Sequence, residues 1–282
     1  MTAEPIRSDK EGIIGIPDPD APIYRFYPLW FFEEALRLRQ LVLVPPHRWE
    51  DPFEVLASGS TIADLRSMPY QQQPLAPYLR PAYAQCWSRT EESDTLLRAY
   101  SRVVKDSHFG HNTDPRHEGV RVRSSATRLI CAGQDWTASL SGVVCFVGAV
   151  RYGTYDQIKQ YLAGLIHQHG PAALGAGQLR AELLLLKRSA FSHEREVRFI
   201  CVDERGNNSQ DVIRIPIDPN ELFEEVTFDP RLVTFERIER ERVARGLGYK
   251  GPFASSDLYQ RTGIQFFFPN GWKEDGATLG SK

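Results

Sequence analysis

Five ionisable side chains with the capacity for chemistry fall within a dozen residues, in a segment that then becomes apolar. They are Lys187, His193, Glu194, Glu196 and Arg198. If the segment is extended, side chains two residues apart point to one face, so Glu194, Glu196 and Arg198 would share it. Such a face has three explanations: a solvated strand edge, a buried ion network or a functional site.

The glutamate pair suits two kinds of chemistry. Close carboxylates raise the pKa of one member, which suits proton transfer, or they stabilise a positive charge that develops during a reaction. Carboxylate oxygens are also ligands for Mg²⁺. The competing interpretation is an exposed strand face on which Arg198 neutralises Glu194 and Glu196, and this is the commoner situation for charged clusters.

Lys187 follows the apolar run Leu183–Leu186, which is typical of a buried helix. Its simplest role is to complement the dipole at the end of that helix. Its closeness to Glu194 makes it a candidate for substrate binding as well, together with His193 and Arg198.

An arginine between aromatic residues marks the expected first strand, Ile23–Tyr27. Arg25 can hold a phosphate or carboxylate through two hydrogen bonds while Tyr24 stacks on a flat group. Strand alternation offers the alternative that Tyr24 and Phe26 point inward and Arg25 lies in solvent.

Two further acidic residues flank a turn signal. Asp51 precedes Pro52, and a helical turn beginning there places Asp51 and Glu54 on one side. They can bind a substrate or a metal, or Asp51 can simply cap the turn.

Ser88 ends the expected strand Ala82–Trp87, before the expected helix Asp94–Val104 that carries Tyr100. No Gly-x-Ser-x-Gly context surrounds this serine, which argues against a serine hydrolase.

Taken in order, these segments resemble a bacterial family. They are Ile23-Tyr-Arg-Phe26, Trp49-Glu-Asp-Pro-Phe-Glu54, Cys86-Trp-Ser88 before Arg98-Ala-Tyr100, and Lys187 with His193-Glu-Arg-Glu-Val-Arg198. Together they resemble domain-of-unknown-function family 2971, over roughly residues 22–260. That family supplies no reaction.

A second, weaker resemblance does imply a reaction. An arginine on the first strand, a serine ending a middle strand and a later Glu-x-Glu strand are similar to the Arg–Ser–Glu arrangement of ADP-ribosyltransferases. The resemblance implies that Arg25 holds NAD, Ser88 supports the nicotinamide-ribose site and Glu196 stabilises an oxocarbenium-like charge. It also implies that Glu194 positions the acceptor and that Tyr100 stacks on nicotinamide.

Three functions therefore remain open. The first is an ADP-ribosyltransferase-like enzyme, a bacterial toxin or phage-defence effector, with NAD as its substrate and an unknown macromolecular acceptor. The second is a Mg²⁺-dependent phosphodiesterase or nuclease, in which Lys187 supports the phosphate and the metal ligands are Asp51, Glu54, Glu194 and Glu196. The third is a non-enzymatic binding or regulatory module whose ion pairs fix the fold.

Composition limits the domain size, the cellular compartment and the partners that we expect. The chain has 282 residues, enough for one large domain with a core, and its net charge of −2 gives no general attraction to nucleic acid or anionic membrane. Its four cysteines lack metal-ligand or disulfide-framework spacing, and no apolar run is long enough to span a bilayer. We expect a cytoplasmic protein with no membrane partner and no resident metal, whose oligomeric state is open.

The pattern of elements predicts an α+β fold, with a mixed, mainly antiparallel sheet of short strands and interspersed helices, similar to that of ADP-ribosyltransferases. We expect a flexible leader over 1–20, a single domain over 21–265 and a polar tail over 266–282. The remaining expected strands are 41–44, 119–124, 143–152, 197–202, 226–230 and 212–217, the last pairing back on 197–202 as a hairpin. The remaining expected helices are 29–40, 154–167, 179–186 and 231–246.

Overall fold

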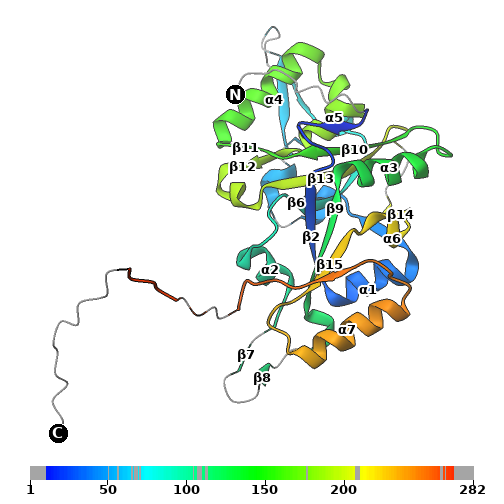
Figure 1. Ribbon diagram of the computed structural model, residues 1–282. Coiled ribbons are helices and arrows are strands. Elements are labelled where there is room, and N and C mark those ends of the chain that lie inside the picture. Colours follow the sequence, from blue (N-terminus) through cyan, green and yellow to red (C-terminus); the bar gives the residue numbers. More distant parts are fainter. Residues whose placement is uncertain are drawn as a thin grey trace.

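A large sheet forms the centre of the molecule (Figure 1). The computed structural model describes residues 11–49, 51–55, 57–64, 66, 69, 71–103, 105–106, 110–111, 114–175, 177–206, 210–260, 263 and 265–269. In spatial order the sheet contains β1 (Ile13–Ile14), β10 (Val143–Ala149), β13 (Glu196–Asp203), β6 (Ala82–Ser88), β2 (Pro22–Pro28), β9 (Gly119–Ser125), β15 (Glu225–Phe228) and β16 (Phe253–Ala254). Only the two edge pairings, β1 with β10 and β15 with β16, are parallel. The predicted α+β class with a mainly antiparallel sheet is confirmed.

Four short strand pairs lie outside this sheet. They are β11 (Arg151–Gly153) with β12 (Leu186–Arg188), β3 (Gln40–Leu43) with β14 (Ile213–Pro216), β4 (Thr61–Asp64) with β5 (Gln71–Pro74), and β7 (Lys105–Asp106) with β8 (Gly110–His111). The parallel β11–β12 pair matters most for the site, because β12 carries Lys187.

Helices lie at both ends of the sheet. The α-helices are α1 (Leu29–Leu38), α2 (Asp94–Tyr100), α3 (Ala126–Thr137), α4 (Tyr155–His169), α5 (Gly177–Leu183), α6 (Pro219–Leu222) and α7 (Thr234–Gly246). The 3₁₀ helices are η1 (Pro46–Arg48), η2 (Pro52–Val55), η3 (Ala76–Tyr78), η4 (Pro115–His117), η5 (Ala172–Gly175) and η6 (Ser189–Glu194). Figure 1 shows α4 and α5 beside β11 and β12 at one end, and α1 and α7 at the other. No helix in the described ranges is long and apolar enough to cross a membrane.

Strand β13 is buried along its whole length, and its two faces differ. Val197 and Phe199 point into the largest hydrophobic cluster, whereas Ile200 belongs to a second, smaller cluster. Alternation places Glu196 and Arg198 on the same face as Ile200. One end of an otherwise apolar face is therefore charged.

The central sheet opens between β6 and β2. These strands share a single residue pair, Tyr24 with Ser88, whereas β2 pairs with β9, and β6 with β13, along seven residues each. A guanidinium crosses the opening, because Nη1 of Arg25 donates a hydrogen bond to the backbone carbonyl of Cys86. The two halves of the sheet thus diverge from Ser88, and side chains can enter between them.

Three sequence-based expectations need correction. The leader predicted over 1–20 is too long, because Ile13 and Ile14 form the edge strand β1 and are buried; residues 1–10 lie outside the described residues. The predicted hairpin is wrong, because β14 pairs with β3 while β13 already has β10 and β6 as neighbours.

The third correction concerns the helix predicted over 179–186. Helix α5 ends at Leu183, and the chain continues into β12, so Lys187 stands on a strand instead of at a helix terminus. The connection packs tightly: a Cβ added to Gly148 would lie 2.3 Å from a methyl carbon of Leu185, whose side chain is buried. Tertiary packing here outweighs the helix propensity of the leucine run.

We expect Gly148→Ala to lower the free energy of unfolding by about 2 kcal/mol, because the added Cβ would displace Leu185, whose side chain is packed in a buried hydrophobic cluster. Urea denaturation would measure the change. The matched control is Gly164→Ala in α4, where an added Cβ meets nothing within 4 Å; it should stabilise the protein by up to about 1 kcal/mol. Equal effects of the two substitutions would contradict the packing argument.

Candidate functional site

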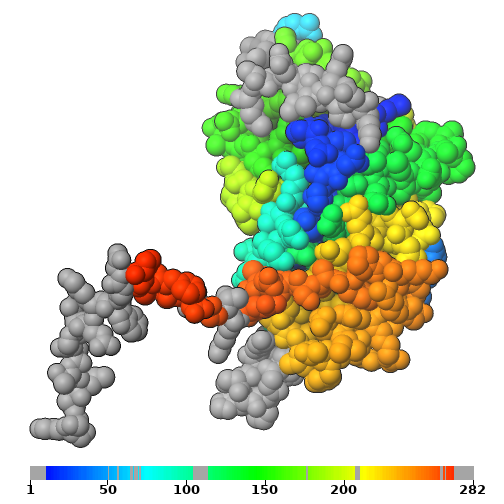
Figure 2. All heavy atoms as spheres, viewed as in Figure 1, coloured from blue at the N-terminus to red at the C-terminus, as the bar shows by residue number. Residues whose placement is uncertain are grey.

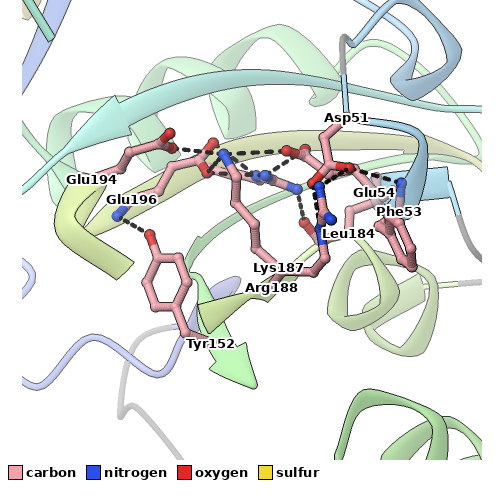
Figure 3. A network of polar contacts seen from close by, with 10 residues as sticks. Asp51, Phe53, Glu54, Tyr152, Leu184, Lys187, Arg188, Glu194 and Glu196 are labelled. Atoms are coloured by element: carbon pink, nitrogen blue, oxygen red, sulfur yellow. Dashed lines mark hydrogen bonds and ion pairs between the residues drawn. The ribbon is translucent and has the colours of Figure 1, made fainter. Parts of the chain in front are cut away.

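The fully buried guanidinium of Arg198 binds two carboxylates. Figure 3 shows the side chains of Glu54, Lys187, Glu194 and Glu196 pointing towards one another. Arg198 donates from Nη2 to Oε2 of Glu54 at 2.6 Å, from Nε to Oε1 of Glu196 at 2.9 Å and from Nη1 to the backbone carbonyl of Leu184 at 2.6 Å. The Trp49 ring packs against the guanidinium, and its centre lies 4.3 Å from the guanidinium carbon. The sequence did not reveal that Arg198 is wholly enclosed.

Lys187 joins the carboxylates. Its Nζ lies 2.6 Å from Glu194, 3.0 Å from Glu196 and 3.2 Å from Glu54. We call Glu54, Lys187, Glu194, Glu196 and Arg198 the ionic cluster. These five side chains comprise three carboxylates and two cations, and Arg25 and Arg48 add two further cations to the wall of the adjoining cavity.

Several elements converge to build this cluster. Glu196 and Arg198 lie two residues apart on β13, as alternation predicts, and Lys187 comes from β12. Glu194, however, ends the 3₁₀ helix η6, so it does not share the strand face as predicted. The chain turns at Arg195, which adopts a left-handed conformation with φ of 44°. That conformation costs a non-glycine residue about 1 kcal/mol.

Asp51 caps the turn, which is one of the two roles predicted for it, and it also pairs with Arg188. One carboxylate oxygen caps η2 by accepting from the Phe53 N–H at 3.0 Å, and the same oxygen pairs with Nη2 of Arg188 at 3.0 Å. The Arg188 guanidinium also stacks over the Phe53 ring at 4.2 Å. This cap fixes η2 and thereby places Glu54 against Arg198.

The pKa values of two glutamates in the cluster are shifted in opposite directions, that of Glu196 downward and that of Glu54 upward. Burial alone would raise the pKa of Glu196, but the Arg198 guanidinium and the Lys187 ammonium outweigh it and lower that pKa to about 2. Burial raises the pKa of Glu54, opposed by the same two cations. Glu196 is therefore ionised at neutral pH, which suits charge stabilisation better than proton donation.

A cavity of about 400 Å³ opens onto the cluster; we call it the charged cavity. It brings together nine of the eleven residues singled out from the sequence, namely Tyr24, Arg25, Asp51, Glu54, Ser88, Tyr100, Lys187, Glu194 and Glu196. The other two do not line it: Arg198 lies beneath the carboxylates, and His193 is exposed on η6.

Ser88 holds the site in shape. Its hydroxyl donates to the backbone carbonyl of Glu194 at 2.5 Å and accepts from the Thr90 N–H at 2.9 Å. It also lies directly across from Glu196 in the β6–β13 register. The serine therefore ties η6 to the central sheet, which makes it a positioning residue for Glu194.

Arg25 and Tyr100 lie where the sheet opens. Arg25 is half-buried, contrary to the simple alternation that would leave it in solvent, and its guanidinium carbon lies 4.7 Å from the Tyr27 ring centre. Burial raises the pKa of Tyr100, while the positive charge of Arg25 opposes the rise. An aromatic ring and a guanidinium are thus held side by side at the cavity wall.

Four contributors were not singled out as site residues from the sequence. Trp49, Cys86 and Phe191 line the charged cavity, and the Tyr152 hydroxyl accepts a hydrogen bond from the Glu196 backbone N–H at 2.8 Å. Trp49 and Cys86 lie in the quoted motifs Trp49-Glu-Asp-Pro-Phe-Glu54 and Cys86-Trp-Ser88, so the sequence offered a signal for both. Tyr152 comes from β11, and nothing in sequence links it to Glu196.

The carboxylates that would bind Mg²⁺ in the phosphodiesterase alternative already pair with cationic side chains. In the described part of the chain no three His, Cys, Asp or Glu side chains are arranged to hold a metal ion. Lys187 and Arg198 lie between the carboxylates that would serve as ligands, and Asp51 pairs with Arg188. The residues present therefore do not fit a Mg²⁺ site.

Comparison with known proteins finds distant likenesses only. No family model matches the chain, and no curated protein matches it, so the resemblance to family 2971 stays a prediction. Similar solved structures include DarT of Thermus sp. 2.9 in complex with ADP-ribosylated ssDNA (TM-score 0.38, 12% identity, 86% of this chain and 97% of that chain). Its complexes with carba-NAD⁺ (0.35, 13%, 86% and 98%) and NAD⁺ (0.33, 14%, 86% and 98%) are also similar. Scores this low carry no functional argument, so the function is argued from the site.

The cluster should make stability depend on pH. The pKa of Glu196 is lowered from 4.5 to about 2 in the folded protein, so its contribution is present above about pH 4.5 and is lost as pH falls towards 2. The shift corresponds to about 3 kcal/mol. Urea denaturation across pH 2–7 should show the free energy of unfolding of wild type falling by about that much more than that of Glu196→Gln. Parallel pH profiles would contradict the assigned ionisation.

Proposed function

We propose that the charged cavity binds NAD and that the protein is an ADP-ribosyltransferase-like enzyme. The observation that carries the proposal is the convergence of Arg25, Ser88, Tyr100 and Glu196 on one cavity, although they lie far apart in sequence. The cavity's volume of about 400 Å³ is within the range of ligand sites.

The charge of the ionic cluster supports this chemistry. The Glu196 carboxylate lines the cavity, and its burial strengthens its interaction with a positive charge that develops there. Glu196 is held ionised by Arg198 and Lys187, so its negative charge is in place before a reaction begins. Preorganised charge of this kind stabilises a transition state more than a ground state in which less positive charge has developed.

The reaction moves a positive charge towards Glu196. The bond between the nicotinamide nitrogen and the ribose carbon breaks, and its electron pair goes to the nitrogen, which cancels the pyridinium charge. The ribose takes on the positive charge, which Glu196 stabilises. A nucleophilic atom of the acceptor then bonds to that carbon and gives up its proton.

The other cavity residues have roles consistent with this scheme. Arg25 offers a cation to the diphosphate, and Tyr100 offers a ring against which nicotinamide can stack. The Glu194 side chain is more exposed than that of Glu196, 23% against 4%, so it is better placed to receive the proton of an incoming acceptor. The acceptor is a macromolecule in this proposal, and a role as toxin or phage-defence effector belongs to the same proposal.

One observation favours a second candidate, a non-enzymatic module. Each carboxylate of the ionic cluster already pairs with Lys187 or Arg198, as in a network that serves only to fix the fold. Under this alternative the substitution of Glu196 would lower stability, and wild-type protein would not act on NAD.

Nicotinamide release from NAD, followed by chromatography, separates the two candidates. Wild type should release nicotinamide, and Glu196→Gln should slow release about a hundredfold or more, because it removes the charge that faces the ribose. Release should be unaffected by EDTA.

Glu118→Gln is the matched control. Glu118 is a buried carboxylate that pairs with Arg240 at 2.7 Å, and it does not line the charged cavity. Its loss should lower stability and leave nicotinamide release from the folded protein intact. No release by wild type would favour the binding module, and abolition of release by EDTA would point to metal-dependent chemistry.

A further inference from the structure

Helix α2 forms one wall of the charged cavity, yet its own packing holds it only weakly. Leu96, Ala99 and Tyr100 line the cavity, and Leu97 is the only buried residue among the seven of the helix. A helix this short is unstable in water by itself. Contacts from elsewhere in the chain therefore decide where the Tyr100 ring lies.

Residues 256–259, which we call the C-terminal segment, pass beside α2. Figures 1 and 2 show this orange part of the chain next to the turquoise helix. Leu258 and Tyr259 pack in one apolar cluster with Leu97, Tyr100 and Tyr24. Tyr24 and Tyr100 line the charged cavity, whereas no residue of the C-terminal segment does. The segment thus lies behind the aromatic wall of the cavity.

The Tyr259 hydroxyl bridges two side chains of α2 that stand one turn apart. It donates to Oδ1 of Asp94 and accepts from Nη2 of Arg98 at 3.3 Å. The Tyr259 ring packs against Arg231, whose guanidinium carbon lies 5.6 Å from the ring centre. Arg231 in turn donates to the hydroxyl of Ser101, which directly follows the last residue of the helix. Tyr259 therefore connects the groups that hold the two ends of α2.

Ser256 is linked to the other aromatic residue of the wall through a buried guanidinium. Its hydroxyl donates to Oε2 of Glu92 at 2.7 Å, and Oε1 of Glu92 accepts from Nη1 of Arg121 at 2.6 Å. Arg121 is buried, and its guanidinium carbon lies 5.2 Å from the centre of the Tyr24 ring. Because Glu92 orients this guanidinium, the bond from Ser256 helps to fix the surface on which Tyr24 rests.

We propose that Ser256 and Tyr259 are positioning residues, which hold Tyr24 and Tyr100 in place as the wall against which nicotinamide stacks. The inference rests on the proposed function for the identity of that ring. Glu196 is held by Arg198 and Lys187 instead. The C-terminal segment should therefore affect the binding of NAD and leave the charge that faces the ribose unchanged.

The kinetics of nicotinamide release test the double variant Ser256→Ala/Tyr259→Phe, which removes both hydroxyls and keeps the packed ring. Its KM for NAD should rise about tenfold while kcat stays within about twofold of wild type, because stacking on Tyr100 stabilises the ground state and the transition state equally. Two residues needed only for folding would behave differently. Their loss would reduce the fraction of active protein, which lowers the apparent kcat and leaves KM unchanged.

Hydrogen exchange measures how firmly α2 is held when NAD is absent. In the double variant the amides of Asp94–Tyr100 should exchange at least about tenfold faster, whereas those of Ala126–Thr137 in α3 should not change. Tyr83→Phe is the control. The Tyr83 hydroxyl accepts a hydrogen bond from the Gln210 N–H at 3.0 Å, and Tyr83 does not line the charged cavity. Its substitution should leave both α2 exchange and KM unchanged.

Unchanged exchange in α2 of the double variant would overturn the inference, and so would faster exchange with an unchanged KM for NAD. An equal rise of KM in Tyr83→Phe would also overturn it, since the effect would not be specific to the C-terminal segment. Failure of the proposed function looks different: wild type would release no nicotinamide, while the double variant still showed faster exchange in α2. In that case the segment holds the aromatic wall, and the assignment of nicotinamide to that wall is wrong.

Discussion

The site depends on the burial of one guanidinium, that of Arg198. A charged group with no exposure must have its donors met inside the protein, because an isolated buried charge is strongly destabilising. Glu196 meets one side of it from the same strand, and Glu54 meets another from a 3₁₀ helix far away in sequence. Arg198 thus fixes η2, the end of α5 and the start of β13 relative to one another.

The carboxylates that satisfy the buried guanidinium, those of Glu54 and Glu196, also line the charged cavity. Lys187 lies between Glu54, Glu194 and Glu196 and offsets the repulsion among them. A network that served stability alone could be replaced by apolar side chains at little cost. The Glu196 carboxylate instead lines the charged cavity, as the proposed stabilisation of a developing cation requires.

The parts of the structure that follow local rules could be predicted, and those set by distant pairing could not. Alternation along β13 predicted that Glu196 and Arg198 share a face, and Pro52 predicted the turn that presents Glu54. The left-handed turn at Arg195 and the strand at Lys187 have no local signal, because η6 and β12 are fixed by contacts with β6 and β11. The β3–β14 pairing likewise joins two segments far apart in sequence, so no local signal predicts it.

The opening of the sheet explains where the charged cavity lies. Since β2 leaves β6 after the Tyr24–Ser88 pair, both strands expose backbone and side chains towards the gap, and Arg25 bridges it through the Cys86 carbonyl. Cys86 itself lies directly across from Arg198, so the gap is anchored to the ionic cluster through one pair of β6–β13 neighbours. An anion bound by Arg25 would therefore act on a residue that both sheet halves hold.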